Sequence, residues 1–524
     1  MARRYKVRKK TMRAFKNGRP GGWVRRVLPA LLPALLLAWC LTVPLAFGAG
    51  TEGGDAPEDD LQAGFDDALP GAGDAPEEGG LEAGFDDALP GEASVEGEEN
   101  LEAGFREDPA LGGAAGEATA SGPAWLTWGG FLRLDSAYNI ARPAPAPGAP
   151  DYRGLNKLRL ALQLELGLKL GRDWDVFVSG QAFHDAAYAL KGREDYTPAT
   201  LKRYESEAEL REGFLRGTLT SWMDIKLGRQ IAVWGKADAI RVVDVLNPVD
   251  FREPGLTDLE DIRIPLSMSR LDFYLGNWSL GAVAVHEVRF DKQPAFGSEF
   301  YPLPIPLPRE EIPAGGGANT EYGVSLAGLF SGWDMAFYWA QVFNDEARFD
   351  AGKLVHDRLT MRGLGFSASA DSWLFKGELA RFDGLRFFGF PGEEFAQVKG
   401  VLGVEYAGFR DTTLSLEAGG RHLKDYREVM AGPPWNLAET VVQYVAFYNG
   451  SFLREKLKLI GQWNYFGHSA EQGSLHRYGL TYELAPALNL GGGLVLYQAG
   501  NGENALLAGV QDNDRLYMDL KWSF

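Results

Sequence analysis

The sequence predicts an all-β protein, a closed antiparallel up-and-down transmembrane β-barrel of about 18 strands (16–18). Three observations support this fold class. Apolar side chains alternate over long stretches, short and long connections alternate along the chain, and the last strand ends in an aromatic residue. Outside the N-terminus, the 524 residues contain no apolar run of the roughly 20 residues that a membrane-spanning helix needs.

The clearest alternation is "LNKLRLALQLELGLKLG" at residues 155–171, where leucine occupies every second position from Leu158 to Leu170. A helix would scatter these leucines around its axis, whereas a strand places all of them on one face. We therefore expect the leucines to face lipid. The polar residues between them are expected to line an aqueous lumen, and they include Arg159, Gln163, Glu165 and Lys169.

Similar segments recur from Trp125 to the end of the chain. The connections between them alternate between short turns, such as "GNW" and "SGW", and longer loops, such as 186–206 and 237–264. This pattern is typical of outer-membrane barrels, which have short periplasmic turns and longer outer loops. The short turns also collect tryptophans, which predict an aromatic girdle at the periplasmic interface, formed by Trp174, Trp222, Trp278, Trp333 and Trp373.

The chain ends in "RLYMDLKWSF", with apolar side chains at alternate positions. The last strands of outer-membrane barrels carry such a pattern with a terminal aromatic residue. Leu520, Trp522 and Phe524 therefore predict the signal that the barrel assembly machinery reads.

Residues 1–49 are predicted to be a signal peptide, because a basic stretch without acids precedes an apolar run that ends in small residues. A retained membrane anchor is the alternative. The only cysteine, Cys40, lies in this run, so the mature chain is expected to lack disulfides and thiol metal sites.

Residues 50–121 form an acidic low-complexity segment, in which copies of the repeat LxAGFDDALPG begin at Leu61 and Leu81. Its composition cannot bury enough apolar surface to fold alone. We expect either a disordered periplasmic tether or short motifs that dock a periplasmic partner. Residues 122–524 are assigned to the barrel. The net charge of −18 comes mostly from the acidic segment, and no basic patch indicates nucleic-acid binding.

The most specific motif is "GRQIAVWGKADAIRVVDVLNPVDFREPGLTDLEDIRIPLSM" at 228–268. It resembles the outer-membrane β-barrel family of domain of unknown function 1302 (DUF1302) of Gram-negative bacteria, and the resemblance extends more weakly over 125–524. The resemblance implies a channel-like role and movement of hydrophobic or lipid-like molecules. It also implies a periplasmic protein and an inner-membrane resistance-nodulation-division (RND) transporter as partners.

The residues of this motif also suggest a role without the resemblance. Residues 237–264 follow a strand that runs outward, and they carry acids and bases in alternation. Such a loop can fold into the lumen, pair with the wall and narrow the pore. Alternatively, these charges only hold an outer loop closed. The predicted constriction residues are Arg229, Gln230, Trp234, Asp238, Arg241, Asp244, Asn247, Asp250, Arg252, Glu253, Glu260, Asp261 and Arg263.

Three functions are compatible with the sequence. The first is an outer-membrane channel for small or hydrophobic solutes, located in the outer membrane with its N-terminal segment in the periplasm. The second is a structural protein that presents the acidic repeats to periplasmic partners. The third, a barrel enzyme such as a lipase, has little support, because neighbouring His468 and Ser469 cannot face each other on a strand. We expect no enzymatic activity, no cofactor and no metal.

Overall fold

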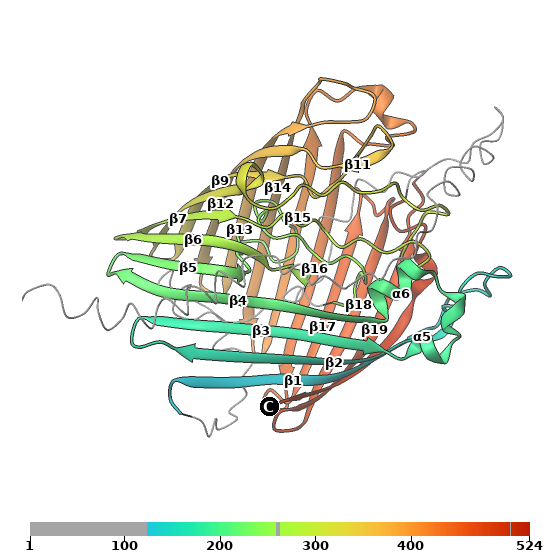
Figure 1. Cartoon of the computed structure of the whole chain (residues 1–524), viewed down its shortest axis with the longest axis horizontal. Coiled ribbons are helices and arrows are strands. Elements are labelled where there is room, and N and C mark those ends of the chain that lie inside the picture. Colours follow the sequence, from blue (N-terminus) through green and yellow to red (C-terminus); the bar gives the residue numbers. More distant parts are fainter. Residues whose placement is uncertain (1–122, 258–261, 503–504) are drawn as a thin grey trace, which may run out of the picture.

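The computed structural model describes residues 123–257, 262–502 and 505–524. The predicted signal peptide and the acidic segment lie outside the described residues, so the predictions about them are not tested here. The described residues form an 18-stranded antiparallel sheet, shown in Figure 1. The strand number and the fold class predicted from the sequence are confirmed.

The sheet is closed, because the first strand, β1, pairs with both β2 and the last strand, β20. Closure leaves no unpaired edge, as a lipid environment requires. The strands of the barrel are β1 (Leu126–Asn139), β2 (Gly154–Lys169), β3 (Trp174–Asp185), β4 (Ser206–Thr220), β5 (Met223–Gln230), β6 (Leu266–Leu275), β7 (Trp278–Val285), β8 (Glu321–Phe330), β9 (Trp333–Phe343), β12 (Arg358–Ala370), β13 (Trp373–Leu385), β14 (Phe395–Phe409), β15 (Thr412–Leu423), β16 (Thr440–Phe452), β17 (Leu457–Phe466), β18 (Gly473–Ala485), β19 (Leu488–Ala499) and β20 (Arg515–Ser523).

Short elements occupy the longer connections, at the end opposite the short turns. They are α5 (Ala187–Leu190), η2 (Arg193–Asp195), α6 (Pro198–Tyr204), η3 (Gly317–Asn319), β10 (Arg348–Asp350), β11 (Lys353–Val355), η4 (Glu428–Ala431) and η5 (Gln511–Asn513). None of the helices in the described part of the chain has the length and apolar character that a membrane crossing requires.

The side chains of β2 alternate between the outer and inner faces of the barrel, as predicted. Leu160 and Leu164 are exposed on the outer surface, whereas Ala161 is buried on the inner side. Exposed apolar side chains continue around the barrel on other strands, and they include Phe337, Phe366, Phe375, Leu416, Tyr465, Leu480 and Met518. An apolar surface of this extent on a closed barrel is typical of a membrane-spanning protein.

The connections alternate as expected, with turns of two to four residues at one end and longer loops at the other. All five tryptophans of the predicted girdle lie at the short-turn end. Trp174, Trp278, Trp333 and Trp373 begin their strands, and Trp222 lies in the turn before β5. Their role at a membrane interface remains a prediction.

The C-terminal residues complete the barrel wall. On β20, Leu520 and Trp522 point outward, opposite Leu134 and Leu132 of β1. Phe524 continues the pairing, because its backbone N–H donates to the carbonyl of Gly130 at 3.0 Å and its carbonyl accepts from Gly130 at 3.1 Å. Recognition of these residues by the assembly machinery is untested.

Two strands end earlier than the sequence suggests. The pattern in 223–235 predicts a strand up to Gly235, but β5 ends at Gln230. The side chain of Asn247 explains the difference, because its Oδ1 accepts the N–H of Ala232 at 2.8 Å. The amide of Asn247 also donates to the carbonyl of Gln230 at 3.4 Å. These bonds replace a strand partner and turn the chain inward. Similarly, the pattern in 278–290 predicts a strand up to Phe290, but β7 ends at Val285.

We predict that Leu164→Arg destabilises the folded barrel by about 2–4 kcal/mol, because it places a charge on the lipid face. The matched control is Gln163→Arg, which places the same charge one residue away in the lumen and should cost much less. Urea titration of the folded protein in lipid vesicles measures both changes. Equal losses of stability in the two variants would contradict the assignment of the faces.

Candidate functional site: a segment folded inside the barrel

The connection between β5 and β6 folds into the barrel. We call residues 231–265 the lumen segment, of which 231–257 and 262–265 are described. Its apolar side chains Ile240, Val243 and Leu246 are at most 2% exposed. They pack in one cluster with inward-facing wall residues from β6 to β16, including Met268, Val285, Ala340, Met361, Val401 and Val445. Along these strands the lumen is therefore filled by an apolar core, and it is not the uniformly aqueous bore that the alternation on β2 suggests.

A carboxylate on the inner wall of the barrel holds the first part of the lumen segment. Glu417 of β15, which is 1% exposed, accepts hydrogen bonds from the backbone N–H groups of Asp238, Ala239 and Ile240. The three distances are 2.6, 3.0 and 2.9 Å. A buried backbone donor without a partner is costly, and this segment has no regular secondary structure to supply one. The two carboxyl oxygens of Glu417 satisfy all three donors at once.

A second carboxylate acts in the same way. Glu378 of β13 accepts from the backbone N–H of Lys236, from that of Ala237 at 2.8 Å and from that of Val243 at 3.2 Å. Gly235 allows this approach, because it has a φ of +102° and a Cβ there would lie 2.6 Å from Oε1 of Glu378. The glycine of the motif is thus required by the close contact with the wall.

Charged side chains of the motif pair with each other and with the wall. Asp244 accepts from Arg241 at 3.3 Å and from Arg263 at 2.9 Å. Asp238 forms an ion pair with Lys376 of β13 at 2.7 Å. These pairs fix the path of the lumen segment across the barrel.

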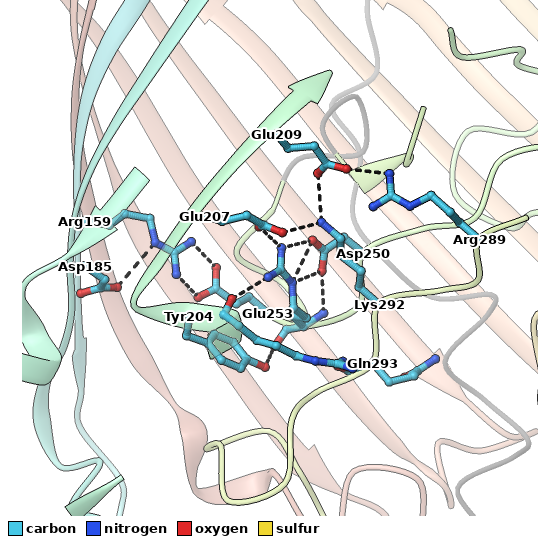
Figure 2. A network of polar contacts seen from close by, with 12 residues as sticks. Arg159, Asp185, Tyr204, Glu207, Glu209, Asp250, Glu253, Arg289, Lys292 and Gln293 are labelled. Atoms are coloured by element: carbon cyan, nitrogen blue, oxygen red, sulfur yellow. Dashed lines mark hydrogen bonds and ion pairs between the residues drawn. The ribbon is translucent and has the colours of Figure 1, made fainter. Parts of the chain in front are cut away.

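A later part of the lumen segment, residues 250–253, is tied to the wall at β2, as Figure 2 shows for Arg159 and Glu253. Glu253 forms ion pairs with Arg159 at 2.9 Å and Lys157 at 2.6 Å, both on β2. Arg159 also lies 3.5 Å from Asp185 at the end of β3. Burial alone raises the pKa of Glu253, but the two cations outweigh it and the pKa is lowered overall. The pair therefore stabilises the fold above the ordinary pKa of glutamate, and this contribution is lost only as the pH falls below it.

The neighbouring residues extend this network to a second loop. Arg252 pairs with Asp250 at 2.6 Å and with Glu207 of β4 at 2.7 Å. Lys292, from the connection between β7 and β8, bonds Glu207 at 2.8 Å and Glu209 at 3.0 Å. Figure 2 shows these side chains converging between the wall and the two connections.

The first residues of the motif support the entry of the segment into the barrel. Arg229 forms an ion pair with Glu287 at 2.6 Å, and the fully buried Gln230 donates to backbone carbonyls, including that of Met268 at 3.2 Å. The ring of Trp234 lies 5.2 Å from the ring of Tyr338.

The remaining predicted residues do not gather at the network. Gln163 donates to Glu165 at 2.7 Å on the inner face of β2. Lys169 is exposed at the short-turn end of that strand. Glu260 and Asp261 lie outside the described residues, so their place is not defined. Any role of the motif residues in narrowing the pore stays a prediction.

A cavity of about 390 Å³ remains beside the lumen segment, lined by β1–β4, β17–β20 and the segment itself. Ten cationic side chains and six carboxylates line it. They are Arg133, Lys157, Arg159, Arg203, Arg211, Arg252, Lys292, Lys458, Arg477 and Lys521, with Asp135, Glu207, Glu209, Asp250, Glu253 and Asp519. In the described ranges, no three His, Cys, Asp or Glu side chains are grouped so that they could hold a metal ion.

Sequence reasoning missed the wall residues that receive the lumen segment. Lys376 and Glu378 lie two residues apart on β13, and Glu417 lies among apolar and small residues of β15. The alternation along each strand places these charges on its inward face. This alone does not identify them as partners of the lumen segment, because many other charged residues also face inward.

The fold and this site define a membrane-spanning β-barrel with a folded segment inside it. The chain belongs to the family described as "Protein of unknown function (DUF1302)", which matches residues 154–524. The resemblance of the motif to this family is thereby confirmed. No curated protein matches the chain.

Among solved structures, the chain is similar to the Acinetobacter baumannii proteins OccAB3 and OccAB1. OccAB3 has 11% identity and a TM-score of 0.48, with 77% of this chain and 100% of that chain covered. OccAB1 has 11% identity and a TM-score of 0.47, with 78% and 99% covered. Pseudomonas aeruginosa OccK9 (OpdG) has 11% identity and a TM-score of 0.47, with 76% and 98% covered.

We predict that Glu417→Ala increases amide hydrogen exchange over residues 238–240 by about tenfold or more. A hydrogen bond contributes roughly 0.5–1.5 kcal/mol net, three of them are lost together, and about 1.4 kcal/mol corresponds to a factor of ten. The control is Glu405→Ala on β14. Glu405 pairs with Lys376 at 3.5 Å and, among the described residues, accepts no hydrogen bond from the lumen segment. Mass spectrometry of the folded protein measures the exchange, and identical protection in the two variants would refute this anchoring role.

Proposed function

We propose that the protein is a channel that lets small water-soluble solutes cross the outer membrane. The polar cavity beside the lumen segment is the observation that carries this proposal. The segment packs its apolar side chains against β6–β16 and turns its charged end toward β1–β4. A path for solutes is therefore confined to one side of the barrel.

The character of this cavity favours small polar solutes. Its volume of about 390 Å³ lies in the range of small-molecule sites. The many ionic side chains around it suit a hydrated solute better than a lipid-like one, because their desolvation by an apolar solute is costly. Passage of lipid-like molecules, suggested by the resemblance, has no support from the residues that line this cavity.

In this proposal the lumen segment sets the width of the path, as predicted for the motif. The ion pairs of Arg252 and Glu253 with the wall hold the charged end of the segment beside the cavity. Loops that carry fixed charges into a lumen control which solutes pass. The roles of an RND transporter and a periplasmic partner remain proposals.

We predict that Arg252→Ala increases the conductance of the purified, folded protein in a planar bilayer. The change removes the bonds to Asp250 and Glu207, so the end of the segment loses one of its attachments to the wall. The control is Arg410→Ala, in a short turn, where the side chain is 95% exposed.

Arg241→Ala is also expected to alter the conductance, because Arg241 fixes the path of the segment through Asp244. The proposed function fails if correctly folded native barrels carry neither ionic current nor solutes such as small sugars into vesicles.

A further prediction separates a channel from a tether. Deletion of residues 51–121 should leave the single-channel conductance unchanged, because the barrel begins at Leu126. A cell that needs only the barrel would tolerate this deletion. Loss of the cellular phenotype in that strain, with the barrel still inserted and conducting, would favour the structural role for the acidic repeats.

A further inference from the structure

The wall formed by β17–β20 carries cationic side chains on three strands, together with one carboxylate of the cavity lining, Asp519 of β20. Lys458 lies on β17, Arg477 on β18 and Lys521 on β20, and all three line the cavity. Nζ of Lys521 lies 4.6 Å from the ring centre of Phe131. Within the described residues, neither lysine forms an ion pair with a carboxylate, in contrast to Arg252 and its neighbours.

The composition of the chain does not explain this excess of positive charge. The protein as a whole has a net charge of −18, yet the lining of the cavity has four more cationic than acidic side chains. Charges of one sign along low-dielectric walls raise the local concentration of the opposite ion. Lysine and arginine around a pore are the arrangement that favours anions.

The same wall leaves room for a solute. Tyr517 of β20 lies against the wall, where Nε of Arg477 is 3.4 Å from its hydroxyl oxygen. A Cβ at Gly479 or Gly493 would lie 2.7 or 2.6 Å from that oxygen. The two glycines therefore let the tyrosine lie close to the sheet and keep the ring from filling the cavity.

We propose that this wall is a binding site for small organic anions such as carboxylates, with Lys458, Arg477 and Lys521 as the groups that attract the negative charge. The inference rests on the proposed channel function and adds its solute class. The ring of Tyr517 offers an apolar surface beside these cations for the uncharged part of the solute.

The test is the ion selectivity of the folded protein in a planar bilayer under a gradient of potassium chloride. The native channel is expected to pass chloride in preference to potassium. The double variant Lys458→Glu/Lys521→Glu is expected to lose or reverse this preference. Lys424→Glu is the matched single-site control, because it makes the same substitution in an exposed outer loop, and it should leave the selectivity unchanged.

A second measurement uses only the native protein, so it does not depend on the folding of a variant. Vesicles that contain the barrel should take up gluconate faster than sorbitol, a neutral solute of similar size. A conducting channel that prefers potassium, or that passes sorbitol as fast as gluconate, would contradict the anion-binding site. The proposed channel function would still hold. Absence of any current or uptake instead overturns the proposed function itself.

Discussion

The interior of this barrel depends on buried carboxylates that accept hydrogen bonds from backbone N–H groups. Glu378 and Glu417 each receive three donors from a segment that has no sheet or helix to satisfy them. Without such acceptors, burying this backbone would cost more free energy than the burial of its apolar side chains contributes. The two acids therefore allow Val243 and Leu246 to reach the inner wall, where they form the centre of the apolar core.

This core divides the barrel into two unlike sides. From β6 to β16, inward-facing side chains such as Met361 and Val445 are buried against the lumen segment. On β1–β4 and β17–β20, ionic side chains of the inward face border the remaining cavity, although β17–β19 also carry a second apolar cluster around Tyr497. The outer face is apolar on both sides, because it meets lipid. The wall from β6 to β16 thus mainly supports packing, and the remaining cavity lies along the other strands.

The sequence predicted those features that repeat along the chain and missed those that depend on single distant residues. The leucines of β2 defined its two faces because a side-chain period of two has only one geometric solution in a strand. The motif predicted an inward loop through its charges. The charges give no indication that the apolar stretch around Val243 forms a core, and the pattern before Gly235 predicts a strand that ends at Gln230 in the structure. The acceptors could not be found because Glu417 lies 179 residues after Asp238.

That separation has a consequence for the order of assembly. The segment between β5 and β6 contacts β13 and β15, and Tyr497 of β19 donates to the carbonyl of Pro254, 243 residues earlier. Contacts so distant in the chain form late, because long loops must close first. The lumen segment can therefore complete its contacts only after β13, β15 and β19, which are synthesised later, have taken their places in the sheet.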